Sequence, residues 1–271
     1  MVPAKPRSVK LGIALALAAA LPALLLGGCD GKPLAPTDGE PPVADDPVYL
    51  TPPRPDAVQA VGEGWRLSGA APPLAQVRLA TPQGKAVTAT ADARGRWTIV
   101  LGASKQPRIF GLSATAKGRQ LQSEGYVLLT PTGQAAVLRA GAGARRIDAA
   151  RRPGLRAIDF DRGGGLEISA EAAPDASLVV RLDERQVANG RTDAAGRYEV
   201  SLPQAGSQTR ILSGGHQAQV FGDGVSDSVS FQITPAAPLV DGPLRSQLTS
   251  AGLRVDWMTP GGGVQSTILV H

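Results

Sequence analysis

A single cysteine follows an apolar run near the start of the chain, and its position gives it the clearest chemistry in the sequence. Three basic residues, Lys5, Arg7 and Lys10, precede the apolar run from 11 to 26, and no acidic residue precedes Cys29. This order of a basic start, an apolar run and small residues is typical of a secretion signal. The run is just shorter than the roughly 17 to 25 residues that span a bilayer. The sequence therefore predicts a leader that ends at a reactive thiol.

The four residues that close the run, Leu26-Gly27-Gly28-Cys29, resemble the lipobox of bacterial lipoproteins. That motif consists of an aliphatic residue, two small residues and an invariant cysteine. The resemblance implies that a diacylglycerol alkylates the Cys29 thiol and that a protease cuts between Gly28 and Cys29, so residues 1–28 are a signal peptide. Two or three acyl chains, palmitate among them, would hold the protein on a membrane at roughly 0.8 kcal/mol per buried CH₂. The alternatives are a buried structural cysteine and an uncleaved anchor.

Loss of the signal peptide changes the charge of the chain. The 271 residues include 28 basic and 23 acidic ones, and three of the basic residues lie within 1–28. The mature chain then has 25 basic against 23 acidic residues, which does not make the basic stripe that nucleic acid needs, so we exclude a nucleic-acid partner. Asp30 resembles the sorting signal of enterobacterial inner-membrane lipoproteins and slightly favours that membrane. We expect a lipid-anchored protein on the periplasmic face of a bacterial cell envelope.

Other residues offer less chemistry. Ser213, His216 and Asp223 can be drawn as a hydrolytic triad, but the nucleophile turn Gly-x-Ser-x-Gly does not occur in the sequence. The acidic segment 222–227 lacks the EF-hand pattern. One cysteine and two histidines form neither an intrachain disulfide nor a metal site built from several soft ligands. We therefore predict no catalytic residue, no metal and no cofactor besides the lipid on Cys29, so the protein is expected not to be an enzyme.

Residues 29–56 begin with the lipidated cysteine and are rich in proline, with almost no apolar periodicity. Such a segment cannot bury enough apolar surface to fold alone. We interpret it as a tether that holds the folded part off the membrane. The whole chain is only 4 % aromatic and contains 33 Gly and 23 Pro, and no segment after the tether sustains a period of 3.6 residues. This composition favours β-strands over helices.

Residues 64–101 repeat as residues 165–202 when the chain is shifted by 101 positions. Ten of the 38 aligned positions are identical, and no gap is needed. Apolar residues alternate with polar ones in the same phase in both copies, as Trp97, Ile99 and Leu101 do in the first. A period of two places one set of side chains on one face of a strand. Each copy is therefore predicted to contain half-buried strands around a common core.

Both copies also contain an Asp-Ala-x-Gly segment, at 92–95 and at 193–196, which we read as a hairpin turn. Together with the strands around it, each copy resembles the bacterial Ig-like modules of surface and envelope proteins. The matching residues are Pro73, Ala75, Val77, Leu79, Thr90, Asp92, Gly95, Trp97, Ile99 and Leu101, and then Pro174, Ala176, Leu178, Val180, Thr192, Asp193, Gly196, Tyr198, Val200 and Leu202. The resemblance implies a β-sandwich without catalytic residues. Carboxypeptidase-regulatory-like modules, which share a similar turn, are the alternative.

These observations predict an all-β protein with two tandem Ig-like β-sandwich domains after a signal peptide and a disordered Pro-rich tether. The expected segments are 1–28 for the signal peptide, 29–56 for the tether, 57–155 for the first sandwich with an Arg-rich connector, and 156–271 for the second sandwich with a C-terminal strand. That last strand either pairs back onto its own domain or meets a partner edge-on.

Four arginines of the connector, Arg145, Arg146, Arg151 and Arg152, lie in a local excess of positive charge. We interpret them as candidates for contact with an anionic partner such as phospholipid headgroups, a lipopolysaccharide-like polymer or an acidic protein. A solvated connector is the alternative. Trp257, beside polar residues, is a candidate for an exposed contact.

The expected function is that of a non-enzymatic, lipid-anchored envelope protein that acts as a scaffold or binding module through its tandem Ig-like domains. Its partners would be membrane lipid, through the acylated Cys29, and an envelope protein or polysaccharide. The alternative is a glycan- or peptidoglycan-binding accessory to an envelope enzyme, in which Trp257 contacts the glycan.

Overall fold

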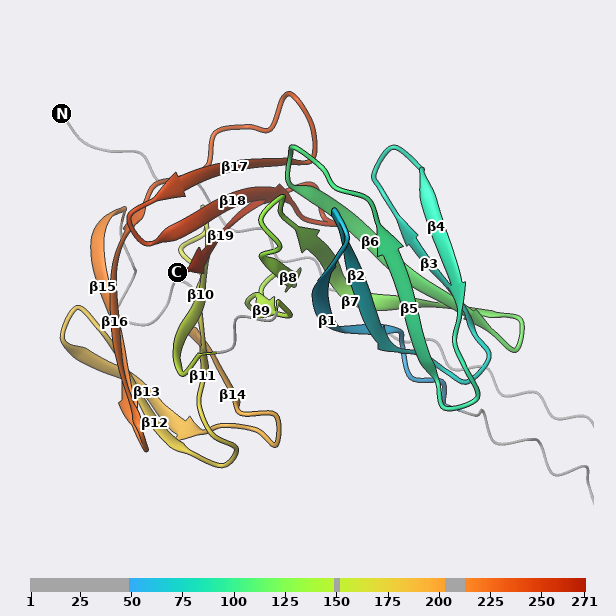
Figure 1. Cartoon of the computed structure of the whole chain (residues 1–271). Helices are drawn as coiled ribbons and strands as arrows, with labels where there is room; N and C mark the ends of the chain where they lie inside the picture. The colour runs from blue at the N-terminus through green and yellow to red at the C-terminus, as the bar shows by residue number, and fades with distance from the viewer. Residues whose placement is uncertain (1–48, 149–151, 203–212) are drawn as a thin grey trace, which may run out of the picture. The chain divides into compact units, whose positions relative to one another are not determined.

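The computed structural model describes residues 49–148, 152–202 and 213–271. The expected signal peptide, Cys29, Asp30 and Arg151 lie outside these residues. Nineteen β-strands, labelled in Figure 1, form the regular structure of the described chain. No helix in this part of the chain is long and apolar enough to cross a membrane. The all-β prediction is confirmed.

Two sheets form the first sandwich. Sheet A has the order β1 (Arg54–Val61), β2 (Gly64–Ala70) and β5 (Arg96–Leu101). Sheet B has the order β4 (Ala86–Thr90), β3 (Gln76–Ala80), β6 (Arg108–Ala116), β7 (Arg119–Leu129), β8 (Ala135–Leu138) and β9 (Arg145–Arg146). A buried apolar cluster that runs from Val58 to Ile147 draws its side chains from both sheets.

Two further sheets form the second sandwich. Sheet C has the order β14 (Arg197–Leu202), β11 (Leu166–Glu171), β10 (Gly154–Asp161), β19 (Val264–Val270), β18 (Gly252–Met258) and β17 (Leu244–Thr249). Sheet D has the order β13 (Arg185–Arg191), β12 (Ser177–Leu182), β15 (Gly214–Gly222) and β16 (Val225–Ile233). Their core runs from Leu155 to Val270. The expected boundary between 155 and 156 falls inside β10.

The alternation read from the sequence is the reason that these strands have one apolar face. Trp97, Ile99 and Leu101 are buried on β5, and the residues between them are exposed. On β3, Val77 and Leu79 are buried on either side of the exposed Arg78. Each buried set faces the core between two sheets, where apolar area removed from water contributes roughly 25 cal/mol per Å².

The internal repeat is confirmed by the strand order. Strands β1, β2 and β5 pair as β10, β11 and β14 do, and β4, β3, β6 and β7 follow one another as β13, β12, β15 and β16 do. Even an unusual backbone conformation recurs: Leu74 and Asp175, which are 101 positions apart, both have a φ of 60°. The copies differ in what extends them, because β8 and β9 extend sheet B in the first sandwich and β17, β18 and β19 extend sheet C in the second.

The Asp-Ala-x-Gly segments form tight turns, but the expectation that they close hairpins is wrong. Asp92 Oδ1 accepts hydrogen bonds from the amides of Arg94 and Arg96, each at 2.8 Å. Gly95 has a φ of 75°, and a Cβ there would lie 2.3 Å from the carbonyl oxygen of Ala71. The strands before and after the turn, β4 and β5, pair in sheets B and A respectively. The turn therefore carries the chain between sheets, and local turn chemistry does not reveal which strand each arm will pair with.

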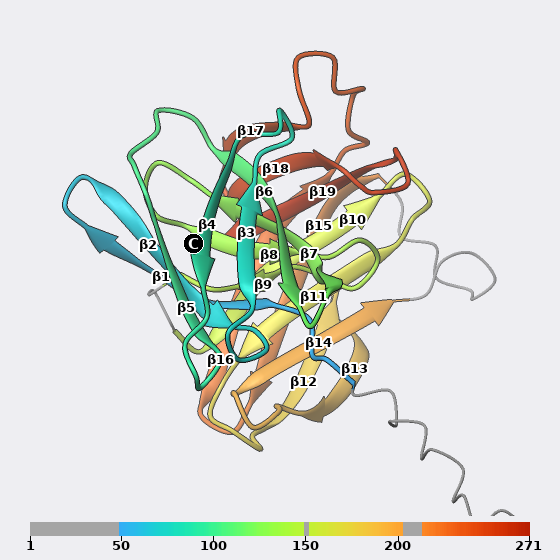
Figure 2. The same cartoon turned by 90° about the vertical axis from the view of Figure 1, so that its right-hand side faces the viewer.

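The C-terminal strand pairs back onto its own domain. Strand β19 lies between β10 and β18 and is antiparallel to both. Figures 1 and 2 show β17, β18 and β19, in red, continuing the sheet that contains β10. The end of the described chain is thus part of the second sandwich.

Candidate binding surface at the junction of the sandwiches

The two sandwiches meet through a third apolar cluster, which we call the junction layer. It joins the outer face of sheet B to the outer face of sheet C. Its buried members are Ile109, Leu128, Ala136, Leu138 and Ala144 from the first sandwich and Ala157, Val255, Trp257 and Leu269 from the second. Sheets B and C are therefore apolar on both faces in this region, which fixes one sandwich against the other.

Trp257 belongs to the junction layer, so the expectation of an exposed contact at this residue is wrong. Its side chain is 0 % exposed. The indole Nε1 donates a hydrogen bond to Thr267 Oγ1 at 3.0 Å, and the Tyr126 ring meets the indole edge-on with 6.0 Å between centroids. The polar neighbours of Trp257 in sequence indicated exposure, but the face of β18 that carries Trp257 is covered by sheet B.

A sequence signal for this second buried face does exist. Strands buried on both faces read as continuous apolar runs and do not alternate. The runs Tyr126–Leu129 and Ala135–Leu138 have this character, and all four residues of β8 are buried. Strands β10 and β19 are also almost wholly buried, but polar residues such as Arg156, Asp159 and Gln265 interrupt their sequences. The apolar runs therefore identify strands of sheet B with two covered faces and do not identify the strands of sheet C that cover them.

Arg146 of the connector and Arg156 of β10 belong to a buried group of charges, which we call the junction ion network. Arg146 Nε lies 2.6 Å from Asp148 Oδ2, and Arg146 Nη1 donates to the carbonyl oxygen of Val270 at 3.0 Å. Arg156 is only 3 % exposed; its Nη2 lies 3.7 Å from Asp148 Oδ1 and its Nε lies 3.4 Å from Glu171 Oε2. The network connects both sandwiches. Because Arg146 is buried in it, the prediction that Arg146 contacts an anionic partner is wrong.

Arg145 and Arg152 are only partly covered. Burial, and after it the charges of Arg197 and Arg139, lowers the pKa of Arg145. The Arg152 Nη1 lies 3.0 Å from Asp227 Oδ2. A contact of Arg145 or Arg152 with an anionic partner stays a prediction, in competition with these intramolecular contacts.

Two buried carboxylates lie beside the junction layer. Asp159 is fully buried and accepts hydrogen bonds from the amide of Ala144, at 2.7 Å, and from Thr267 Oγ1. Glu167 is also buried, on the neighbouring strand β11. Because Ala144 belongs to the first sandwich, Asp159 holds the β8–β9 turn onto sheet C.

The surroundings of these two carboxylates raise their pKa values. Burial raises the pKa of Asp159 to about 6, although its hydrogen bonds from Thr267, Ala144 and Gln265 act in the opposite direction. Burial, and after it the negative charges of Asp159 and Asp161, raises the pKa of Glu167 to about 7. Each carboxyl therefore holds its proton more tightly in the folded chain than in the unfolded one.

We expect the free energy of unfolding to fall as the pH rises from about 4 to about 7. In this window the folded chain binds more protons than the unfolded chain, so their release at higher pH favours unfolding. The stabilisation from the tighter proton binding is complete below the ordinary carboxyl pKa, and it is lost above the raised pKa values of Asp159 and Glu167. The variant Glu167→Gln should remove much of this slope and should be more stable than the wild type at pH 8, by on the order of 2 kcal/mol.

Urea titrations at several pH values between 5 and 8 measure this effect. Glu63→Gln, at an exposed position, is the matched control and should leave the slope as it is. Parallel curves for the wild type and Glu167→Gln would show that the Glu167 carboxyl does not cause the pH dependence.

The residues considered as a hydrolytic triad, Ser213, His216 and Asp223, do not come together. His216 Nδ1 lies 2.7 Å from Asp183 Oδ2, whereas Asp223 accepts a hydrogen bond from the amide of Ser177 at 2.9 Å. His216 lies near the start of β15 and Asp223 lies just after its end, so the two side chains are not brought together. In the described ranges there is no group of three or more His, Cys, Asp or Glu placed to hold a metal ion.

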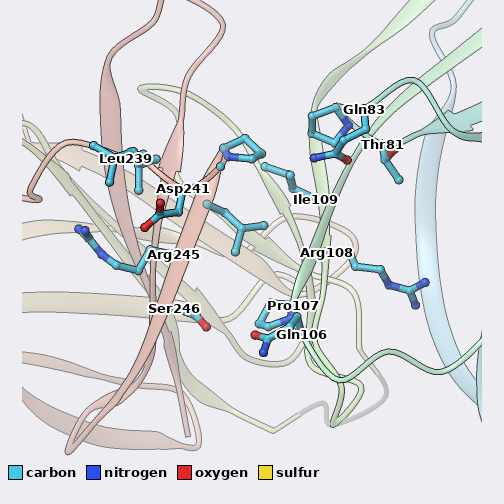
Figure 3. A pocket seen from close by; sticks show the side chains of 15 residues that line it. Thr81, Gln83, Gln106, Pro107, Arg108, Ile109, Leu239, Asp241, Arg245 and Ser246 are labelled. Atoms are coloured by element: carbon cyan, nitrogen blue, oxygen red, sulfur yellow. The ribbon is translucent and has the colours of Figure 1, made fainter.

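A cavity of about 480 Å³ opens at the edge of the junction layer, and Figure 3 shows it from close by. One wall is the start of β17 with the loop before it, and the other is the start of β6 with the β3–β4 turn. Its lining is mainly aliphatic, proline, amide and hydroxyl groups, and it includes the carboxylate of Asp241. Arg108 and Arg245 point away from the cavity in Figure 3; their guanidinium groups donate to Gly102 O and Asp256 Oδ2 respectively.

A second cavity of about 450 Å³ adjoins the first. The two share Thr81, Pro82, Ile109 and Pro243 in their linings, and we call them together the junction groove. Ile109 is also a member of the junction layer. The groove is therefore the uncovered continuation of the surface on which sheets B and C pack.

The comparisons with known proteins come from structure alone, because no family model and no curated protein matches the sequence. The chain is similar to a solved structure titled "Biofilm associated protein - BSP domain", with 13 % identity over 70 % of this chain and 30 % of that chain and a TM-score of 0.24. It is also similar to the "Central Fibronectin-III array of RIM-binding protein", with 15 % identity over 82 % of this chain and 90 % of that chain and a TM-score of 0.26. The chain spans less than a third of the first structure. The sheets described above define the class: an all-β protein of two tandem Ig-like sandwiches.

Proposed function

We propose that this protein is a non-enzymatic, lipid-anchored envelope protein that works as a scaffold or binding module through its two sandwiches. The observation that carries the proposal is the junction groove, whose walls come from both sandwiches. Loops and strand edges on rigid β-scaffolds are common places for partner binding. The lipobox-like residues that end at Cys29 support the anchor.

Rigidity at the junction supports a role in binding. The junction layer, the junction ion network and the bond from Ala144 to Asp159 all join one sandwich to the other. A groove whose walls are already fixed loses less conformational entropy when a partner binds. The proposed partner is an envelope protein. The glycan-binding alternative depended on an exposed Trp257, and the burial of that residue removes its support.

Acylation is tested by feeding cells radiolabelled palmitate. We expect label in the wild-type protein and none in Cys29→Ser, because a hydroxyl does not replace the thiolate that takes the diacylglycerol. The wild type should also sediment with membranes, and the serine variant should lose this association unless it keeps its signal peptide as an anchor. Equal label in both proteins would contradict lipidation at Cys29.

Binding is tested with a photo-crosslinking amino acid placed in the living cell. Val240 is 83 % exposed and lines the groove, while the exposed Val87, on β4, does not line it. The proposal expects a crosslink from position 240 to an envelope protein and no such crosslink from position 87. The same products from both positions, or none from position 240, would count against a partner in the groove.

A further inference from the structure

The backbone of β17 has an open edge beside the junction groove. Within the described residues β17 pairs only with β18 and is the last strand of sheet C. Its first residues, Leu244, Arg245 and Ser246, form one wall of the larger cavity. An exposed strand edge is a template for pairing with another strand.

The register shows which backbone groups face the groove. The amide of Met258 donates to the carbonyl oxygen of Pro243 at 2.9 Å. Bonded and non-bonded pairs alternate along an antiparallel ladder, so the next pair, Leu244 with Trp257, is non-bonded, and so is Ser246 with Val255. The N–H and C=O groups of Leu244 and Ser246 are therefore directed away from β18, toward the groove.

The opposite wall of the groove is formed by the start of β6, where β6 is no longer paired with β3. Strand β3 pairs with β6 from Gln76–Thr115 to Ala80–Gly111 and then turns away at Thr81. The start of β6, including Ile109, continues beyond β3 and lines the groove. Gly111 lines it too, and a Cβ added to Gly111 would meet nothing within 4 Å. The hydroxyl of Thr81, which lines both cavities, is buried without a hydrogen-bond partner.

Two exposed apolar side chains lie at the groove. Of the seven large apolar side chains that are exposed in the described chain, Val240 and Met258 line it, whereas Leu248 lies farther along β17 and is not part of the lining. Exposed apolar groups that cluster mark interaction sites more often than single ones do. The surface is also continuous with the junction layer, on which sheet C already packs against sheet B.

We propose that the junction groove binds an extended, largely uncharged polypeptide segment of an envelope protein as an additional strand on β17. One more strand, about 4.8 Å from β17, would extend sheet C over the part of sheet B that it leaves uncovered. The main chain of the segment would bond to Leu244 and Ser246, and alternate apolar side chains would face Ile109 and Gly111. This is the strand-addition mode of peptide recognition, and it rests on the proposed role as a binding module.

Two variants test the geometry, each with a matched control. Gly111→Leu fills the groove where the chain itself has open space, and Gly102→Leu adds the same side chain at another glycine whose Cβ would meet nothing, away from the groove. Ser246→Pro removes an N–H that the sheet does not use, and Ser246→Ala keeps it. Thermal unfolding of each variant confirms that the fold is retained.

The probe is a phage-displayed library of random linear dodecapeptides, selected on the full chain in detergent. A recovered peptide is then labelled and titrated. We expect Gly111→Leu and Ser246→Pro each to weaken binding by about tenfold or more, and the two controls by less than about twofold. N-methylation of every second peptide residue should abolish binding for either the odd or the even residues, but not for both. The reason is that an added strand hydrogen-bonds to β17 through only one of its two edges.

Three results would overturn the inference. One is a selection that yields no peptide able to distinguish the wild type from Gly111→Leu. Another is a peptide whose affinity is unchanged by Ser246→Pro and is affected equally by N-methylation at odd and at even residues. The third is a dimer of the chain that Ser246→Pro dissociates, which would make a second copy the occupant. The crosslink from Val240 and the palmitate label report on the proposed function separately from these results.

Discussion

Trp257→Ala is expected to lower the free energy of unfolding by about 3–5 kcal/mol. The indole is fully buried in the junction layer, packs edge-on against Tyr126 and donates to Thr267. Its removal leaves a cavity between two sheets and takes away one hydrogen bond to Thr267 Oγ1, which still donates to Asp159. Guanidinium denaturation followed by circular dichroism measures the loss.

The same variant has a second expected signature. Because the junction layer connects the sandwiches, a cavity there should weaken their coupling, and one cooperative transition should separate into two. Val240→Ala, at an exposed position on the groove, is the control and should change stability by no more than about 0.5 kcal/mol. A loss for Trp257→Ala as small as that of the control would show that the indole is not buried between the sheets.

Asp148→Ala is expected to cost about 3–5 kcal/mol, because it leaves buried positive charge without its partner. Asp148 accepts from the amide of Ala135 at 3.0 Å and pairs with both Arg146 and Arg156. The side chains of these three charged residues are almost wholly buried. Chemical denaturation of the purified variant measures the effect.

The control is an exposed pair of the same chemistry. Arg191 Nη1 and Asp175 Oδ2 lie 3.2 Å apart with side chains that are 62 % and 81 % exposed, so Arg191→Ala should cost less than about 1 kcal/mol. Adding Arg146→Met to Asp148→Ala should recover part of the lost stability, because it removes one uncompensated charge. Additive losses from the two substitutions would contradict a charge-pair origin.

Some features of the candidate site could be predicted from the sequence and others could not. The excess of arginine at 145–152 was visible, but the burial of Arg146 was not, because its contact with Val270 joins residues that are distant in the chain. Trp257 was assigned to solvent from its polar neighbours, whereas the deciding neighbour is Tyr126, far away in sequence. The open edge of β17 follows from the strand order of sheet C, which depends on pairings across more than a hundred residues.

Alternating apolar residues, a repeat at 101 positions and the Asp-Ala-x-Gly turns were enough to establish that the folded part is all-β and built twice, because side-chain period and turn chemistry are local properties of the chain. Only the tertiary structure decided that the two sandwiches share a buried layer, that their arginines neutralise carboxylates across it, and that a groove remains at its edge. These features arise where faces from distant strands meet, and local sequence patterns show which faces are apolar but not which face each will cover.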